Sequence, residues 1–210
     1  MMVKKSIPHL GLAGVVILVC FCLVGWGETW EEIERDAADI VSIRAEFSQY
    51  KHLKILAKPL VSQGRFYFQK PDSIRWEYRD PVKSVLLMHR GDVRRFTVGS
   101  RGLVEEAAGA VSSMQIVVRE IGLWSQGRFR ESDHFRAEIR RGGEGKLVLT
   151  PRDKAFAAMI ERIEIVPSPR RKGAIKSVKI VESEGNFTLL TFANVEMNEK
   201  IAETVFRNAE

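Results

Sequence analysis

The sequence GRFYFQKPDSIRWEYR, residues 64–79, contains the clearest structural pattern in this chain. From Ser73 to Arg79, apolar and charged side chains alternate, which is typical of a β-strand with one face buried and the other in water. Residues 64–70 predict a second strand, and Pro71-Asp72 predicts the turn between the two. The stretch therefore predicts an antiparallel hairpin with one apolar face.

Strand patterns continue on both sides of this hairpin. The period is two from Phe47 onward, and short turns separate the segments that follow. Strands joined by tight turns form an antiparallel sheet that is apolar on one side and wet on the other. The further predicted strands lie at residues 84–89, 93–98, 134–141, 146–149, 160–166, 175–182 and 187–195.

Three segments predict helices. Residues 29–44 and 114–124 repeat apolar side chains at the helical period, and Ser112 or Ser113 is expected to cap the second helix. Residues 150–156 predict a short third helix that is capped by its first residue, a threonine. These segments are expected to cover the apolar face of the sheet.

The predicted elements define a fold class. Residues 99–110 carry few signals of order and predict a mobile loop between sheet and helix. No linker, repeat or low-complexity stretch separates a second domain, so residues 28–210 are expected to form one domain. We expect a mainly β fold with α: a single curled antiparallel sheet of roughly ten strands, covered by two or three helices.

The first 27 residues predict a cleaved secretory signal peptide. Lys4 and Lys5 precede an uncharged, largely apolar segment at residues 10–27, which ends in small residues before the first acid, Glu28. An uncleaved membrane anchor is the alternative, because this segment approaches the length needed to span a bilayer. Removal of the segment also removes two lysines and lowers the net charge from +6 to +4, a mild basic excess.

Both cysteines of the chain, Cys20 and Cys22, lie within this apolar segment. Val19 and Phe21 precede them, whereas lipid attachment requires a small residue at that position, so no lipid anchor is expected. After cleavage the chain would contain no cysteine, which excludes a disulfide, a thiolate nucleophile and a cysteine metal site.

Residues that could carry catalysis or bind a metal do not cluster in the sequence. His52, His89 and His134 each lack a second histidine or cysteine at ligand spacing, so no metal site is expected. The glycine-rich residues 141–145 lie between two predicted strands and predict a hairpin turn, not a phosphate-binding loop. We therefore expect no catalytic residues, no metal and no cofactor.

A basic segment raises the question of nucleic-acid binding. Residues 170–172, Lys176 and Lys179 lie near exposed aromatic side chains on a predicted sheet, a combination that can bind single strands. Acidic residues such as Glu164 and Glu182 surround the segment, and a secretory signal leads the chain away from nucleic acid. No nucleic-acid partner is expected.

Large apolar side chains crowd the first strands of the predicted sheet. The simplest interpretation is a packed core. However, two or three short helices cannot easily fill the inside of a wide curled sheet, so the remaining space predicts an apolar pocket. The side chains expected to line it are Phe47, Phe66, Phe68, Ile74, Trp76, Tyr78, Leu87 and Phe96.

The order of these motifs resembles the LolA family, the periplasmic carriers of outer-membrane lipoproteins. The resemblance extends from Glu28 to Phe206 and depends on a succession of weak motifs rather than on one strong motif. They are Phe47-Ser48-Gln49, residues 64–71, residues 74–78 with Pro81, residues 149–153, and residues 192–195 with Asn198 and Phe206.

The resemblance implies a fold, a function and partners. It implies an incomplete half β-barrel under a helical lid, and a non-enzymatic periplasmic chaperone that holds acyl chains in a hydrophobic cavity. Such a carrier, expected as a monomer, takes lipoproteins from an inner-membrane ABC exporter to an outer-membrane receptor, and Trp76 matches the family's aromatic strand residue. A LolA-like carrier of another lipid or lipid-linked export cargo, or a non-catalytic envelope interaction module, is the alternative.

The expected lid and its latch complete the predicted site. The family often has an arginine directly before the strand-ending proline, whereas this chain has Lys70, which cannot reproduce the forked hydrogen bonding of a guanidinium. The standard latch and the identity of the cargo are therefore open. A fixed core helix is the alternative to a lid, whose apolar face we expect to consist of Met114, Val117, Val118, Ile121 and Trp124.

Overall fold

The chain folds around one wide, curled sheet. A computed structural model describes residues 29–100, 102–142 and 145–210, with the side chains of residues 108–114 excepted. Within these ranges, eleven strands form a single antiparallel sheet in the order β6-β5-β4-β3-β2-β1-β11-β10-β9-β8-β7. The elements are α1 (Trp30–Ala38), β1 (Ser42–His52), β2 (Leu60–Gln69), β3 (Ser73–Asp80), β4 (Ser84–His89), β5 (Asp92–Gly99), β6 (Gly102–Glu105), α2 (Ala108–Trp124), the 3-10 helix η1 (Phe129–Glu131), β7 (Phe135–Arg140), β8 (Lys146–Pro151), α3 (Lys154–Ala157), β9 (Arg162–Pro167), β10 (Ile175–Ser183), β11 (Asn186–Met197) and α4 (Thr204–Arg207).

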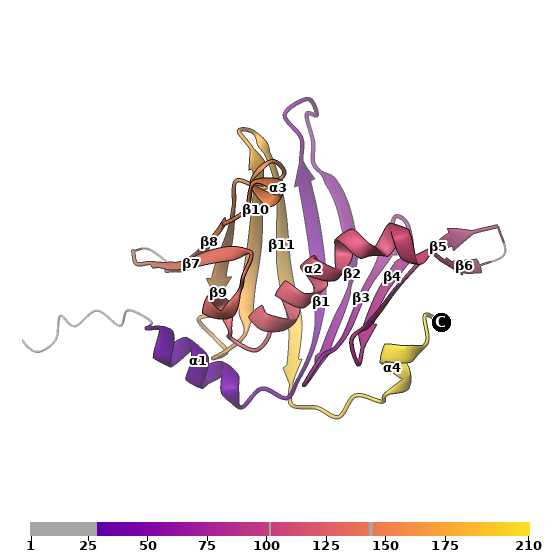
Figure 1. Cartoon of the computed structure of the whole chain (residues 1–210), viewed down its shortest axis with the longest axis horizontal. Coiled ribbons are helices and arrows are strands. Elements are labelled where there is room, and N and C mark those ends of the chain that lie inside the picture. The colour runs from indigo at the N-terminus through magenta and orange to yellow at the C-terminus, as the bar shows by residue number, and fades with distance from the viewer. Residues whose placement is uncertain (1–28, 101, 143–144) are drawn as a thin grey trace, which may run out of the picture.

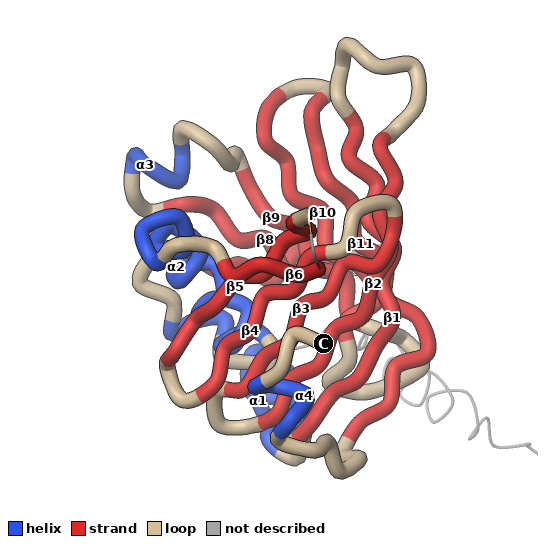
Figure 2. Tube along the Cα trace, turned by 90° about the vertical axis from the view of Figure 1, so that its right-hand side faces the viewer, coloured by secondary structure: helices blue, strands red, loops and turns tan. Residues whose placement is uncertain are grey.

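The helices lie on different sides of this sheet. Helix α2 crosses the concave face, and α1 lies near one end of it (Figure 1). Seen from the side, the sheet bends around α2 without closing into a barrel, and α4 lies on the outer face over β3 and β4 (Figure 2). The expected fold, a mainly β half-barrel with a few helices, is confirmed.

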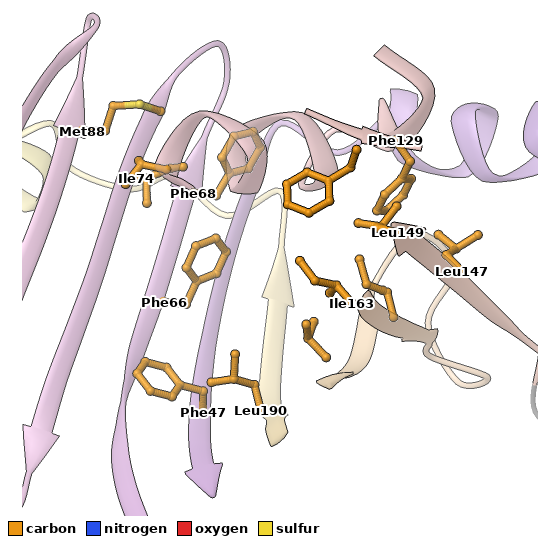
Figure 3. Packing of buried hydrophobic residues seen from close by; sticks show 14 of the residues in the cluster. Phe47, Phe66, Phe68, Ile74, Met88, Phe129, Leu147, Leu149, Ile163 and Leu190 are labelled. Atoms are coloured by element: carbon orange, nitrogen blue, oxygen red, sulfur yellow. The ribbon is translucent and has the colours of Figure 1, made fainter. Parts of the chain in front are cut away.

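Alternation along the strands assigns each side chain to one face. Phe66 pairs with Trp76 and Phe68 with Ile74 across β2 and β3, so all four point to the concave side. Figure 3 shows Phe47, Phe66 and Phe68 projecting toward the same interior as the labelled side chains from the other half of the sheet. The concave face therefore carries the main core, which also contains Met88, Val118, Phe129, Phe135, Leu147, Leu149, Phe156, Ile163, Ile165, Val178 and Leu190.

A second, smaller cluster lies on the outer face. Leu87 pairs with Arg75 across β3 and β4, and Phe96 pairs with Val85 across β4 and β5. Because Arg75 points away from the concave side, Leu87 and Phe96 do too, and they pack with the C-terminal Ala209. The expectation that these two residues line the concave site is wrong.

Several predicted boundaries also differ from the structure. The first helix ends at Ala38 instead of residue 44, because pairing of Ile43 with Phe68 of β2 and Met197 of β11 makes the chain extended there. The second helix begins at Ala108, ahead of its predicted serine caps, and β6 occupies part of the predicted loop. Thr150 belongs to β8, and Asp153 caps α3 instead.

No helix in the described ranges is long and apolar enough to cross a bilayer. The signal peptide expected at residues 1–27 lies outside the described residues.

The C-terminal segment is held on the outer face by one buried arginine. The Arg75 guanidinium donates hydrogen bonds to the carbonyl oxygens of Val205, Asn208 and Ala209, two of them at 3.1 Å. Its Nε donates to Glu77 Oε2 at 2.9 Å. A single side chain thus satisfies three carbonyls and neutralises one largely buried carboxylate.

The substitution Arg75→Ala tests this arrangement. We expect the free energy of unfolding in urea to fall by about 3 kcal/mol, because the change leaves a shielded carboxylate and several carbonyls without their donor. Arg79→Ala is the matched control on the same face of β3: Arg79 is half exposed and 3.8 Å from Glu77, so its loss should cost under about 1 kcal/mol. Equal effects of the two substitutions would contradict the assigned role of Arg75.

Candidate functional site

The concave face has an aromatic floor near the middle of the sheet. The Phe47 ring lies 4.9 Å from Trp76 and 5.2 Å from Tyr78, and Trp76 lies 5.3 Å from Phe66, centroid to centroid. Phe192 of β11 extends this group, 6.5 Å from Trp76. Trp76, Tyr78 and Phe192 keep part of their surface accessible. The floor is therefore a continuous aromatic surface that is only partly covered.

A glycine in β2 makes this ring packing possible. A Cβ atom at Gly64 would lie 2.6 Å from Cζ of Phe47 and 2.0 Å from the carbonyl oxygen of Glu77. No side chain fits there, so the Phe47 ring can pack closely against the β2 backbone. Gly64 is part of the floor even though it contributes no side chain.

The aromatic side chains of the floor are uncharged. The Tyr78 hydroxyl donates a hydrogen bond to Gln49 Oε1 at 2.8 Å. Burial raises the pKa of Tyr78, an effect that the neighbouring Trp76 indole and the Arg95 charge only partly oppose. The phenol therefore stays protonated at neutral pH, and the surface suits an uncharged apolar ligand.

Helix α2 covers one side of this floor. Val118 is fully buried, and Ile121 and Trp124 pack against the core. At Gly122, a Cβ would lie within 3.8 Å of both Met88 and Ile74, so the helix backbone itself approaches β3 and β4. The inward stripe of the helix is thus built on Val118, Ile121 and Gly122.

Two other members of the predicted lid face differ in their placement. Val117 is 43% exposed and points away from the core. The side chain of Met114 lies outside the described residues, although its backbone belongs to α2. Ile116 packs partly against the core and was not predicted, because it lies outside the apolar stripe that the helical spacing of residues 114–124 indicated.

Helix α2 buries two polar groups that lack a full set of hydrogen bonds. Glu120 is only 2% exposed, and its Oε2 has no hydrogen-bond partner among the described atoms. Burial raises the pKa of Glu120. A hydrogen bond with Ser132 and the charge of His134 lower it, but they offset only part of this rise. The indole N–H of Trp124 is also buried without a described partner. Such groups make the covered position of the helix less stable than a fully apolar contact would be.

The turn between β2 and β3 connects the two helices. The Lys70 ammonium donates to the carbonyl oxygens of Ala38 at 2.7 Å and Ala37 at 3.5 Å, at the end of α1. Gln126, just after α2, donates to the carbonyl oxygen of Pro71 at 3.4 Å. The lysine thus bonds to two carbonyls, as an arginine could. Its ammonium is a point charge and not a planar fork, and the hydrogen bond to Ala37 is the longer of the two.

The C-terminal end of α2 also touches α1 directly. Gly127 has a positive φ of 74°, and a Cβ there would lie 2.5 Å from the Ala37 Cβ. The Arg130 guanidinium lies over the Trp30 ring at 5.6 Å and bonds to Glu34. At the opposite end of α2, the N-cap residue Ala107 provides no side-chain cap. The helix is therefore tied down at its C-terminal end and not capped at the other.

The space beside α2 is small. A cleft of about 270 Å³ lies between the helix and the ends of β3–β5, lined by residues such as Met88, Val93 and Leu123. Typical pockets for organic ligands measure about 300–1,000 Å³. The structure therefore differs from the roomy hollow that the sequence predicts beneath the helices: buried side chains fill much of the interior.

The structure brings most of the predicted site together. Phe47, Phe66, Phe68, Ile74, Trp76 and Tyr78 share the concave face, whereas Leu87 and Phe96 do not. The site residues missed from sequence are Leu190 and Phe192, although the alternation of β11 contains the signal that could have found them. In the part of the chain that the structure describes, no three His, Cys, Asp or Glu side chains are grouped as metal ligands.

Comparison with known proteins gives consistent matches over most of the chain. The family model described as "Outer membrane lipoprotein carrier protein LolA" matches residues 38–209. Outer-membrane lipoprotein carrier proteins of Cupriavidus taiwanensis and Ralstonia nicotianae are 25% and 26% identical, over 84% and 95% of this chain and 82% and 91% of their own. A solved LolA superfamily protein from Nitrosomonas europaea covers 86% of this chain and 98% of its own, with 9% identity and a TM-score of 0.44.

The buried carboxyl on α2 generates a pH-dependent prediction. Because the folded pKa of Glu120 is raised, its contribution to stability is full below the unfolded pKa and is lost as pH rises through the folded pKa. Glu120→Gln removes this loss, so we expect the variant to be more stable than wild type by about 1 kcal/mol at pH 7.5. The advantage should shrink toward pH 4.5 in urea titrations.

Glu138→Gln on β7 serves as the control, since Glu138 is exposed. It should leave the unfolding curve unchanged at both pH values. An advantage of Glu120→Gln that is the same at pH 7.5 and pH 4.5 would show that ionisation of Glu120 is not its source.

Proposed function

This chain belongs to the LolA family of outer-membrane lipoprotein carriers, and from that premise we propose that it binds the acyl chains of lipoproteins on the concave face of its sheet. Proteins of this family are periplasmic, non-enzymatic binding proteins. The observation that carries the proposal is the partly covered aromatic floor around Trp76, on the same face of the sheet as a helix that buries two polar groups without described partners.

The energetics of the cargo explain why a carrier is needed. Transfer of a 16-carbon chain from a bilayer to water costs on the order of 12 kcal/mol, at about 0.8 kcal/mol per CH₂. A cargo with three such chains would need roughly 35 kcal/mol, so unassisted release is negligible. The aromatic floor offers an apolar surface that replaces the contact with lipid tails.

The small cleft requires a movable cover in this proposal. Helix α2 swings away from the floor, and its tied C-terminal end, near Gln126 and Gly127, acts as the pivot. Displacement would give water access to Glu120 and to the Trp124 indole, which offsets part of the apolar contact that the helix loses. Lys70 keeps α1 and the β2–β3 turn together during this motion, and so occupies the latch position.

The route of the cargo follows from the family. We infer that residues 1–27 direct export and are cleaved, which leaves a soluble periplasmic monomer. An inner-membrane ABC exporter would load the carrier, and an outer-membrane receptor would unload it. The mild positive charge of the processed chain favours neither partner by itself.

Tryptophan fluorescence tests cargo binding. A triacylated lipopeptide with brominated acyl chains should quench the emission of the processed protein, because bromine quenches an indole that it contacts. Trp76→Phe keeps an aromatic ring on the floor and should remove most of this quenching. Quenching that persists unchanged in Trp76→Phe would place the chains elsewhere, and no quenching in the wild type would contradict the carrier function.

The inward stripe of α2 provides a second test. Ile121→Glu places a charge on the side of the helix that packs against the core, and we expect lipopeptide affinity to fall at least about tenfold with little change in the melting curve. Val117→Glu on the exposed side of the same helix should keep wild-type affinity. Global unfolding of Ile121→Glu would instead favour a fixed core helix.

A further inference from the structure

The hairpin between β1 and β2 exposes a group of aliphatic side chains at its tip. Ile55 is 88% exposed, and Leu56, Leu60 and Val61 are also largely accessible. Apolar side chains of this size are normally exposed singly, so four within seven residues call for an explanation. None of them faces the concave floor or the outer cluster.

Strand lengths make this hairpin protrude from the sheet. The pairing of β1 with β2 continues as far as Lys51 and Leu60. The pairing of β2 with β3 ends three positions earlier, at Gln63 and Asp80. The hairpin therefore extends beyond its β3 neighbour, and it stands at the top of the molecule beside the β10–β11 turn (Figure 1).

The base of the hairpin is held in place. The Lys54 amide donates to Asn186 Oδ1 at 2.9 Å, and the Leu56 amide donates to the Leu53 carbonyl at 2.8 Å. The His52 ring stacks on Phe187 of β11 at 4.2 Å. These contacts keep the tip pointing outward instead of folding back on the sheet.

Lysines flank the apolar tip within the hairpin. Residues 51–63 contain Lys51, Lys54 and Lys58 and no acid. Lys51 pairs with Glu182 at 3.3 Å, whereas Lys54 and Lys58 are exposed and form no ion pair within the described residues. Two cations are thus available on either side of Ile55 and Leu56.

We propose that this hairpin docks the protein on a lipid bilayer that contains anionic headgroups. Ile55 and Leu56 enter the boundary between headgroups and acyl chains, and Lys54 and Lys58 bind lipid phosphates. Basic residues beside an apolar edge are the pattern of interfacial membrane binding. Protein interfaces, by contrast, are enriched in aromatic residues and depleted in lysine, and residues 53–61 contain two lysines and no aromatic residue.

Membrane docking rests on the proposed carrier function only for its biological use. A carrier of acyl chains gains from contact with a bilayer at the moment of transfer, since the chains then cross less water. Docking itself requires no cargo and no opening of α2. The two proposals can therefore fail separately.

Vesicle flotation tests the docking. The protein, purified after export and processing, is mixed with vesicles of phosphatidylethanolamine and phosphatidylglycerol, or with vesicles of phosphatidylcholine alone. Wild type should float with the anionic vesicles and bind the neutral ones more weakly. The double substitution Ile55→Glu, Leu56→Glu should lower the vesicle affinity at least about tenfold. The matched control is Val41→Glu, a charge placed at an exposed valine before β1, and it should bind like wild type.

Salt and lysine variants separate the two contributions. Lys54→Gln and Lys58→Gln should each lower affinity about fivefold and reduce its dependence on salt. Melting curves of all variants should match wild type, because the substituted side chains are exposed. The proposal is overturned if wild type does not float, or if the Ile55, Leu56 variant floats as wild type does. The vesicles contain no lipoprotein, so either result leaves the lipopeptide quenching experiment unaffected.

Discussion

The contact between α2 and the concave face controls how much apolar surface this molecule exposes. The sheet curls enough to gather aromatic and aliphatic side chains from both of its halves, but not enough to close on itself. A curled sheet without a closed interior must cover its concave face with another element. Here α1, η1 and α3 supply part of that cover. The rest is α2, whose inward stripe includes a glycine and which buries a carboxylate and an indole N–H without complete hydrogen bonding.

Strand β3 serves both faces of the sheet because its alternation is strict. Ile74, Trp76 and Tyr78 point to the floor, while Arg75 and Glu77 point outward and hold the C-terminal segment. A shift of one residue in register would put a buried ion pair into the floor and an indole on the outer face. The C-terminal carbonyls bound by Arg75 thus help to fix the register on which the site depends.

The sequence predicts the features that depend on alternation within one strand or hairpin. It does not predict the features that depend on pairing between residues distant in the chain. The hairpin at residues 64–79 was correct in position and facing. Leu87 and Phe96 were assigned to the site by their size, but only the register with Arg75 and Val85 reveals that they face outward. Ile40 and Val41 continue the helical spacing of α1, yet the ladders of β1 begin immediately after them. Nothing near Glu120 in the sequence indicates that its carboxylate is buried, because Ser132 and His134 surround it only in the folded chain.

Within the described residues, side chains fill much of the space beneath the helices, which is consistent with the carrier function that we propose. Empty apolar space costs about 24 cal/mol per Å³, so a void of about 500 Å³ would cost on the order of 12 kcal/mol. That is about the whole stability of a typical domain. A protein that closes its apolar face with its own helix avoids this cost, and in the proposed mechanism it exchanges the helix for cargo. In that proposal the exchange is reversible because the covered position of the helix is stable but not optimal: Glu120 Oε2 and the Trp124 indole N–H are buried there without a described partner.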